Sequence, residues 1–259
     1  MTVCRPASTT PSHDVLVPAL RDVRAVVFDT DGVITDSARV HAAAWKTAFD
    51  THLDEHPPED PGLRRPFDPQ DDYLRYVDGR SRLDGAAAFL ASRGMDTSAG
   101  TVQAVAAEKE RLFTRSLREH GVDAFPGTVR LVRALREAGV PCAAASASRH
   151  AGELLGRAGV LDLFDVLVDG GEAARLGLAG KPRPDLFLEA VGRLGVPAGR
   201  SAVVEDALAG VEAGRDGGFA LVVGVDRTAG PGTRERLLRH GAGIVVRDLA
   251  ELLVSEAPR

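Results

Sequence analysis

The stretch Arg24-Ala25-Val26-Val27-Phe28-Asp29-Thr30-Asp31-Gly32 decides the fold. Residues 25–28 are apolar, which is typical of a buried strand, and the two aspartates and the glycine that follow predict a polar turn. In an open parallel sheet, ligands bind at the carboxyl ends of the strands. Asp29 and Asp31 are therefore the first candidates for a functional site.

Strand and helix patterns alternate along the chain after Pro126-Gly127. Short apolar runs predict strands over 140–145, 164–168, 202–204, 220–225 and 243–246, and amphipathic stretches between them predict helices. This alternation is typical of βαβ units, which build a mainly parallel sheet. A long region of helical pattern separates the first strand from this series, so we predict an α/β core that is interrupted by a helical insertion.

Composition and charge exclude several classes of protein. The 259 residues carry 32 Lys and Arg against 37 Asp and Glu, a net charge of −5, and the lack of a basic stripe argues against a nucleic-acid partner. Apolar residues make up 44% of the chain, and Cys4 and Cys142 are the only cysteines, which argues against a disulfide framework. No apolar run approaches the ~20 residues that span a bilayer, and the N-terminus lacks a signal-peptide pattern. We expect a cytoplasmic, monomeric protein with no membrane partner.

Polar residues follow several of the predicted strands. They are Ser146-Ala147-Ser148 after 140–145, Glu205-Asp206 after 202–204, and Lys181-Pro182 in a loop before a later helix. Together with Asp29 and Asp31 they bring four carboxylates, a hydroxyl and a lysine to one edge of the sheet. Crowded carboxylates repel unless a hard cation binds among them, and Mg²⁺ prefers carboxylates together with water and phosphate oxygens. A carboxylate can also attack phosphorus, while a lysine and a hydroxyl stabilise the transferring group, so the pattern favours phosphoryl transfer.

Four motifs, in order along the chain, resemble those of the haloacid dehalogenase-like phosphotransferase superfamily. They are Phe28-Asp29-Thr30-Asp31-Gly32-Val33, Ser146, Lys181-Pro182-Arg183-Pro184-Asp185 and Glu205-Asp206. The resemblance extends from Arg24 to Val246 and implies a Rossmann-like core with a mobile helical cap and a Mg²⁺-dependent aspartyl-phosphate mechanism. By this match Asp29 is the nucleophile and Asp31 is the general acid/base. The metal ligands it implies are Asp29, the backbone carbonyl of Asp31, Asp206 and Glu205.

Further segments are similar to the β-phosphoglucomutase branch of that superfamily. They are Gly32-Val33-Ile34-Thr35-Asp36-Ser37 followed by His41, then Gly79-Arg80-Ser81-Arg82, and Ala143-Ala144-Ala145-Ser146-Ala147-Ser148. The match implies that Gly79 and Arg82 belong to a cap loop whose arginine binds the phosphate that is not transferred. It also implies that His41 couples cap closure to proton transfer at Asp31. Ser146 and Ala147 would contact the transferring phosphoryl group, and Ser148, Arg149 and His150 would lie near the sugar.

Four positions depart from the pattern of that branch. Thr30 stands where the family usually has leucine, and Asp78 precedes Gly79 where well-known members carry a lysine. Ala207 replaces a common serine after the acidic pair. Lys109, in Glu108-Lys109-Glu110, matches a basic cap segment only loosely. Asp78 removes the expected lysine contact to the sugar and Ala207 removes a hydroxyl, and these two departures keep a phosphatase of the same superfamily as the alternative.

These observations lead to a division of the chain and to an expected activity. We expect a flexible N-terminal extension over 1–22, a Rossmann-like core over 23–37 and 121–259, a helical cap over 38–120, and a Pro- and Asp-rich loop at 54–72. The expected enzyme is a phosphoglucomutase that converts β-D-glucose 1-phosphate to glucose 6-phosphate through an aspartyl-phosphate and glucose 1,6-bisphosphate, with a small sugar phosphate as its partner. The alternative is a phosphatase of the same superfamily that hydrolyses a sugar phosphate or another small phosphoester. A catalytically silent binding protein is disfavoured because Asp29 and Asp31 are both present.

Overall fold

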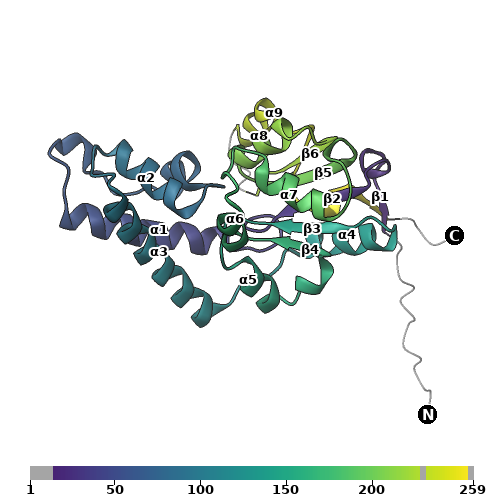
Figure 1. Cartoon of the computed structure of the whole chain (residues 1–259), viewed down its shortest axis with the longest axis horizontal. Coiled ribbons are helices and arrows are strands. Elements are labelled where there is room, and N and C mark those ends of the chain that lie inside the picture. Colours follow the sequence, from purple (N-terminus) through teal and green to yellow (C-terminus); the bar gives the residue numbers. More distant parts are fainter. Residues whose placement is uncertain (1–13, 228–231, 256–259) are drawn as a thin grey trace, which may run out of the picture.

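A parallel sheet forms the centre of the core in the computed structural model, which describes residues 14–227 and 232–255 (Figure 1). Six parallel strands lie in the order β4 (Val166–Val168), β3 (Cys142–Ala145), β2 (Ala25–Asp29), β5 (Ser201–Glu205), β6 (Leu221–Val225) and β7 (Ile244–Val246). The α/β fold class with a mainly parallel sheet, which the sequence predicts, is confirmed.

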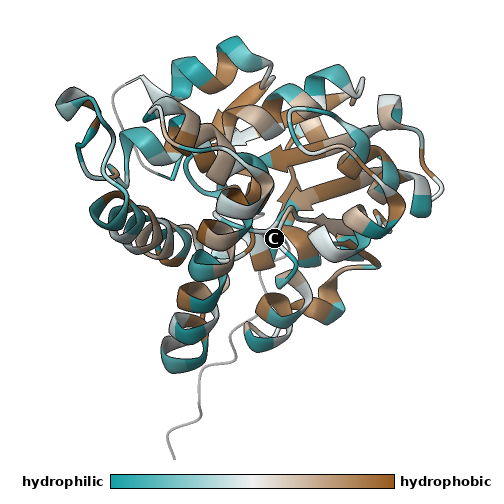
Figure 2. Cartoon of the chain, turned by 60° about the vertical axis from the view of Figure 1, so that its left-hand side comes forward, coloured by the Kyte–Doolittle hydropathy of each residue, from teal (hydrophilic) through white to brown (hydrophobic). Residues whose placement is uncertain are grey.

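Helices cover both faces of this sheet, which explains why its strands are apolar along their whole length. The helices of the core are α4 (Pro126–Glu137), α5 (Ala151–Arg157), α6 (Gly170–Leu176), α7 (Asp185–Arg193), α8 (Leu208–Asp216) and α9 (Thr233–His240). Val26 and Phe28 of β2 belong to an apolar cluster with residues of α4 and α5, whereas Ala25 and Val27 belong to a second cluster with residues of α7, α8 and α9. In Figure 2 the strands and the inner faces of the helices are brown, and the outer turns are teal. Short 3₁₀ turns connect these elements at Leu161–Leu163, Ala198–Arg200 and Leu249–Leu252.

Residues 14–22 pack against the core, which differs from the flexible extension expected over 1–22. Strand β1 (Asp14–Leu16) pairs antiparallel with β8 (Leu253–Ser255), and a 3₁₀ turn follows at Pro18–Leu20. Leu16 and Leu20 are buried in the same apolar cluster as α4. Residues 1–13 lie outside the described residues.

The region 38–120, which we call the cap, consists mainly of three helices beside the core (Figure 1). They are α1 (Ala38–Glu55), α2 (Arg82–Ser92) and α3 (Ala99–His120). An apolar cluster that includes Phe49, Phe67 and Phe89 holds them together. None of the described helices is long and apolar enough to cross a membrane.

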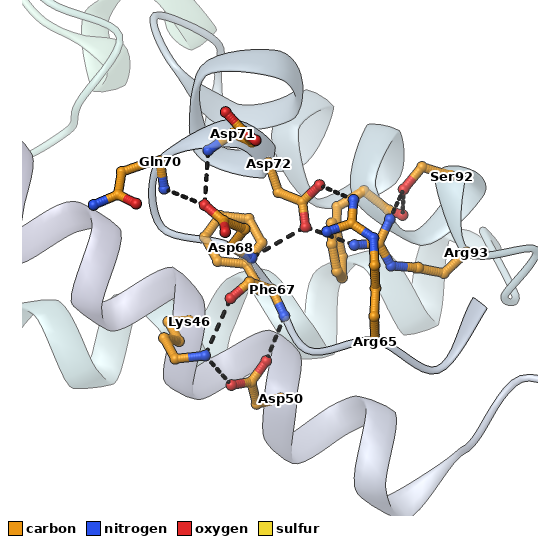
Figure 3. A network of polar contacts seen from close by, with 11 residues as sticks. Lys46, Asp50, Arg65, Phe67, Asp68, Gln70, Asp71, Asp72, Ser92 and Arg93 are labelled. Atoms are coloured by element: carbon orange, nitrogen blue, oxygen red, sulfur yellow. Dashed lines mark hydrogen bonds and ion pairs between the residues drawn. The ribbon is translucent and has the colours of Figure 1, made fainter. Parts of the chain in front are cut away.

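The loop at 54–72 is held inside the cap by a network of polar contacts (Figure 3). Its first two residues extend α1, and a 3₁₀ turn forms at Pro61–Leu63. The Asp50 carboxylate accepts a 2.8 Å hydrogen bond from the backbone N–H of Phe67, and Lys46 donates to the carbonyl of Phe67 at 3.1 Å. At the end of the loop, Asp72 forms ion pairs with Arg65 at 2.7 Å and with Arg93 at 2.6 Å. These contacts hold the start of a π-helical turn at Tyr73–Val77, which leads into the segment 78–82.

Candidate active site

A pocket lies where the cap meets the carboxyl ends of strands β2, β3 and β5. From the core it is lined by Asp29, Asp31, Lys181, Glu205 and Asp206, among others, and from the cap by His41, Asp78, Gly79, Arg82, Lys109 and Glu110. Residues separated by long stretches of sequence therefore meet in one place. The strand-end residues that the sequence singles out are brought together here by the parallel sheet.

Lys181 links two of the carboxylates in the floor of the pocket. Its Nζ lies 2.5 Å from Asp29 Oδ1 and 2.5 Å from Glu205 Oε1, and all three side chains are buried. Burial opposes the charge on the ammonium, but the two carboxylates outweigh burial and raise the pKa of Lys181 above its usual value. Lys181 is therefore a fixed cation beside the Asp29 carboxylate.

Asp29, Glu205 and Asp206 form a compact set of carboxylates. Each offers an oxygen atom, and these three atoms lie within 4.8 Å of one another. Burial is the main cause that raises the pKa of Asp29 and Asp206 well above their usual values, and neighbouring carboxylates raise them further. Oxygen ligands at this spacing suit a hard divalent cation, which would also relieve the repulsion. The three residues therefore fit a metal site.

Gly32 allows the chain to turn closely past this set of carboxylates. Its φ is +82°, and a Cβ placed there would lie 1.8 Å from Asp206 Oδ2. Only glycine accepts this conformation without strain and leaves room for the Asp206 side chain. The turn between β2 and the cap therefore requires glycine at position 32, because the Asp206 carboxylate lies against it.

Asp31 is connected to the cap by a chain of polar contacts. Ser37 Oγ donates a hydrogen bond to Asp31 Oδ1, His41 Nε2 lies 3.2 Å from the same oxygen, and Lys109 Nζ lies 2.8 Å from His41 Nδ1. Lysine has donors only, so Nδ1 of a neutral imidazole accepts and its proton lies on Nε2, facing Asp31. Burial opposes ionisation of Asp31, but His41 first, and then Ser37 and Lys109, lower its pKa well below the usual range. Asp31 is therefore held as a carboxylate.

Lys109 and His41 are unusual in that both are buried. Burial lowers the pKa of His41, and the charge of Lys109 lowers it further. Burial likewise lowers the pKa of Lys109, to about 8. The His41 ring also stacks on Phe113, with 4.0 Å between the centroids. The sequence marked His41 as a site residue, but it indicated Lys109 only weakly.

The residues after β3 form another wall of the pocket. Ala147, Ser148 and Arg149 line it. Ser146, by contrast, is buried and is not part of the pocket lining, and its hydroxyl oxygen accepts a 3.1 Å hydrogen bond from the backbone N–H of Ser148. Ser146 thus lies at the end of β3, next to the pocket wall.

The segment 78–82 of the cap lies directly on the core. A Cβ placed on Gly79, whose φ is +66°, would lie 2.9 Å from the Cβ of Ala207. Arg82 follows at the start of α2, and its Nη1 lies 3.4 Å from Glu110 Oε2. Glu110 Oε1 contacts Nε2 of His150, which belongs to the core. The structure therefore has the cap closed over the core.

Two pocket residues, Glu110 and Asp78, are absent from the set that the sequence predicts. Glu110 and Lys109 interrupt an apolar face of α3 that includes Ala106 and Phe113. Charged residues on such a buried helix face are a sequence signal that could have identified Glu110. Asp78 is a departure from the family pattern; burial first, and Glu205 second, raise its pKa to about 7. It brings a further carboxylate into the pocket.

Comparisons with known proteins agree with this geometry. The model of the haloacid dehalogenase-like hydrolase family matches residues 23–218. A β-phosphoglucomutase of Mycobacterium bovis is 42% identical over 240 residues, which cover 89% of this chain and 92% of the relative. The β-phosphoglucomutase of Bacillus subtilis is 33% identical over 238 residues, which cover 89% of this chain and 92% of the relative. The crystal structure of a β-phosphoglucomutase from Clostridium difficile has a TM-score of 0.69 at 25% identity and covers 89% of this chain and 93% of that one. The chain therefore belongs to the haloacid dehalogenase-like hydrolase family, in its β-phosphoglucomutase-like branch.

Proposed function

We propose that the protein is a Mg²⁺-dependent phosphoglucomutase that converts β-D-glucose 1-phosphate to glucose 6-phosphate through an aspartyl-phosphate and glucose 1,6-bisphosphate. The observation that carries this proposal is the closed cap, which places Arg82 in the same pocket as Asp29, Asp31 and Lys181. A mutase has to hold two phosphates and exclude water, and a closed pocket with cations from both cap and core suits both needs. The β-phosphoglucomutase relatives support the same activity.

Asp29 at the end of β2 and Asp31 in the turn after it would carry the reaction. The phosphorylated Asp29 passes its phosphoryl group to the 6-hydroxyl of glucose 1-phosphate, and Asp31 takes the proton of that hydroxyl. After the bisphosphate reorients, Asp29 takes the phosphoryl group from carbon 1, and Asp31 returns the proton to the oxygen that is left. His41 and Lys109 orient Asp31 from the cap, so that cap closure completes the site. The same two aspartates thus serve both halves of the reaction.

The phosphoryl group in transfer would be held by the core. Lys181 supplies positive charge beside Asp29, and the Ser146 hydroxyl and the backbone at Ala147 supply donors to its oxygens. The family implies a divalent metal, and we propose that it is Mg²⁺, bound by Asp29, Asp206, Glu205 and the backbone carbonyl of Asp31. When bound, Mg²⁺ neutralises charge on the phosphoryl oxygens.

The other end of the sugar phosphate would be held between cap and core. We assign the phosphate that is not transferred to Arg82, with Gly79 shaping the loop that brings Arg82 to the pocket. Ser148, Arg149 and His150 would contact the same end of the substrate. All these residues come from one chain, so a monomer suffices for the site. We propose further that the enzyme acts in the cytoplasm.

A sugar-phosphate phosphatase is the second candidate, and Asp78 is the observation that favours it. A carboxylate stands there in place of the lysine that well-known members of the branch carry next to the sugar. The two activities differ only in the acceptor of the phosphoryl group, which is a sugar hydroxyl for the mutase and water for the phosphatase.

The distinguishing experiment follows the products. The protein is incubated with Mg²⁺, β-D-glucose 1-phosphate and a trace of glucose 1,6-bisphosphate, and glucose 6-phosphate and inorganic phosphate are both measured. Glucose 6-phosphate as the main product is expected, and a dominant release of inorganic phosphate would establish the phosphatase instead. An Asp29→Asn variant serves as the control, since it should form neither product nor an acid-stable phosphoenzyme.

A further inference from the structure

Glu110 is held by two basic side chains that come from opposite sides of the boundary between cap and core. Its Oε1 contacts Nε2 of His150 in the core, and its Oε2 lies 3.4 Å from Nη1 of Arg82 in the cap. The Glu110 side chain is 24% exposed, and the residue lines the pocket. One carboxylate of the pocket lining therefore bridges the two parts of the protein.

The ionisation of Glu110 agrees with this contact. Burial opposes ionisation, but the hydrogen bond with His150 first, followed by the charges of Lys109, His150 and Arg82, lowers the pKa of Glu110 to about 2. The hydrogen bond with Glu110 in turn raises the pKa of His150. The contact therefore favours the charged form of both partners.

The two fully buried cations among the described residues of the pocket are already engaged elsewhere. Lys181 contacts Asp29 and Glu205, and Lys109 contacts His41. Arg82 differs from these two because its side chain is 28% exposed and its ion pair is with Glu110, which is 24% exposed. A guanidinium binds a carboxylate and a phosphate through the same planar set of donors, so whichever anion is present can take this position.

We propose that Glu110 is a specificity-determining residue, whose carboxylate occupies the position of the substrate's non-transferred phosphate and has to be displaced from Arg82 and His150 when substrate binds. This inference rests on the proposed function, because it needs a substrate with a second phosphate. A phosphate carries nearly two negative charges at neutral pH against one for a carboxylate, so it can displace Glu110. An uncharged sugar end cannot, and Glu110 would thus discriminate against molecules that lack the second phosphate.

Substitution of Glu110 by glutamine tests the proposal, with Glu108→Gln as a matched control. Glu108 lies two residues earlier on α3 and pairs with Arg111 outside the pocket. Both substitutions are made in the Asp29→Asn chain, so that phosphoryl transfer does not disturb the measurement. The dissociation constant of glucose 1,6-bisphosphate is then measured by calorimetry in the presence of Mg²⁺. Glu110→Gln should lower this constant about tenfold, which corresponds to about 1.4 kcal/mol, and Glu108→Gln should leave it unchanged.

A second measurement separates competition from a general effect on the site. With Asp29 intact, the KM for a small aryl phosphate, which has no second phosphate, should differ between Glu110→Gln and the natural chain by much less than the tenfold change expected for the bisphosphate. Weaker binding of the bisphosphate by Glu110→Gln would mean that Glu110 orients Arg82 for the substrate. An unchanged dissociation constant would mean that Glu110 does not compete with the substrate's phosphate. Either result overturns the inference. If neither the Glu110→Gln variant nor the chain that keeps Glu110 binds the bisphosphate, the proposed mutase function fails as well. A Glu110→Asp variant, too short to reach both partners, should bind the bisphosphate more tightly than the chain with Glu110 and guards against a defect peculiar to glutamine.

Discussion

Gly79 of the cap lies against Ala207 of the core so closely that a Cβ on Gly79 would lie 2.9 Å from the Cβ of Ala207. The closed position of the cap thus depends on one residue without a side chain and one with a single methyl group. The carboxylate of Glu205 accepts a 2.7 Å hydrogen bond from the backbone N–H of Ala207, so the core side of this contact is tied to the carboxylates of the site.

Gly79→Ala should hinder cap closure. The added methyl group meets Ala207, and the φ of +66° adds strain of about 1–2 kcal/mol. We expect kcat/KM for β-D-glucose 1-phosphate to fall at least about tenfold, which corresponds to ~1.4 kcal/mol. Gly94→Ala is the matched control, because Gly94 has a similar φ of +63° but its added Cβ would meet only Leu63, inside the cap. Equal losses in both variants would show that strain, rather than the contact with the core, causes the effect.

Asp206→Asn should stabilise the protein in the absence of metal. The folded Asp206 has a raised pKa, mainly through burial and then through Asp78 and Glu205. An unfolded carboxyl loses its proton near pH 3.8, so this group makes the metal-free fold less stable as pH rises above that value. Without the charge we expect Tm at neutral pH to rise by ~2–4 °C, and the added stabilisation by Mg²⁺ to shrink. Thermal unfolding with EDTA and with Mg²⁺ measures both effects, and the exposed Asp54→Asn should change neither.

Asp72→Asn should destabilise the cap. Asp72 and Arg93 are both buried, and the substitution leaves the Arg93 charge without its 2.6 Å partner. Removing one member of a buried ion pair costs about 3–5 kcal/mol. Urea unfolding followed by the fluorescence of Trp45, which belongs to the apolar cluster of the cap, should show this loss. The neighbouring exposed Asp71→Asn should have almost no effect, and a loss below about 1 kcal/mol for Asp72→Asn would contradict the assigned role.

The imidazole of His150 should titrate above its ordinary pKa of 6.5, because the hydrogen bond to Glu110 favours the charged form. Since the folded pKa is raised, the contact contributes its full stability below about pH 6.5 and loses it as pH rises through the folded pKa. Nuclear magnetic resonance of the His150 ring measures the midpoint directly. Glu110→Gln should shift that midpoint downward, whereas Glu108→Gln should leave it in place; a midpoint that ignores Glu110 would be inconsistent with the contact.

The sheet could be predicted from the sequence because each buried strand is a nearly continuous apolar run. Ala25–Asp29 and Ser201–Glu205 lie between helices on both faces, so no polar alternation obscures them. The same physics locates the site, since parallel strands end at one edge and carry Asp29 and Glu205 to it. Strand β1 escaped prediction because three residues carry little periodicity, and its partner β8 lies at the other end of the chain.

The cap side of the site was harder to predict. Glu110 and Asp78 gain their significance from residues of the core that lie far away in sequence, His150 for the first and Glu205 for the second. No local sequence pattern predicts these contacts between cap and core, because they depend on how the cap closes. Lys109 illustrates the same difficulty, since an isolated lysine on a helix is usually solvated, whereas here it is buried against His41.

The two connections between cap and core run side by side. Thr35 pairs with Ala124 in an antiparallel bridge, and the N–H of Asp36 donates to the carbonyl of Asp123 at 2.9 Å. The cap thus enters and leaves the core at a single point, so a short turn grafted between residues 37 and 121 could replace it without disturbing the order of the strands. Such a capless chain would retain Ser37 and its hydrogen bond to Asp31, but it would lose His41, Lys109 and Arg82 together. It would thus be a natural starting point for exchanging one substrate specificity for another as a single cassette.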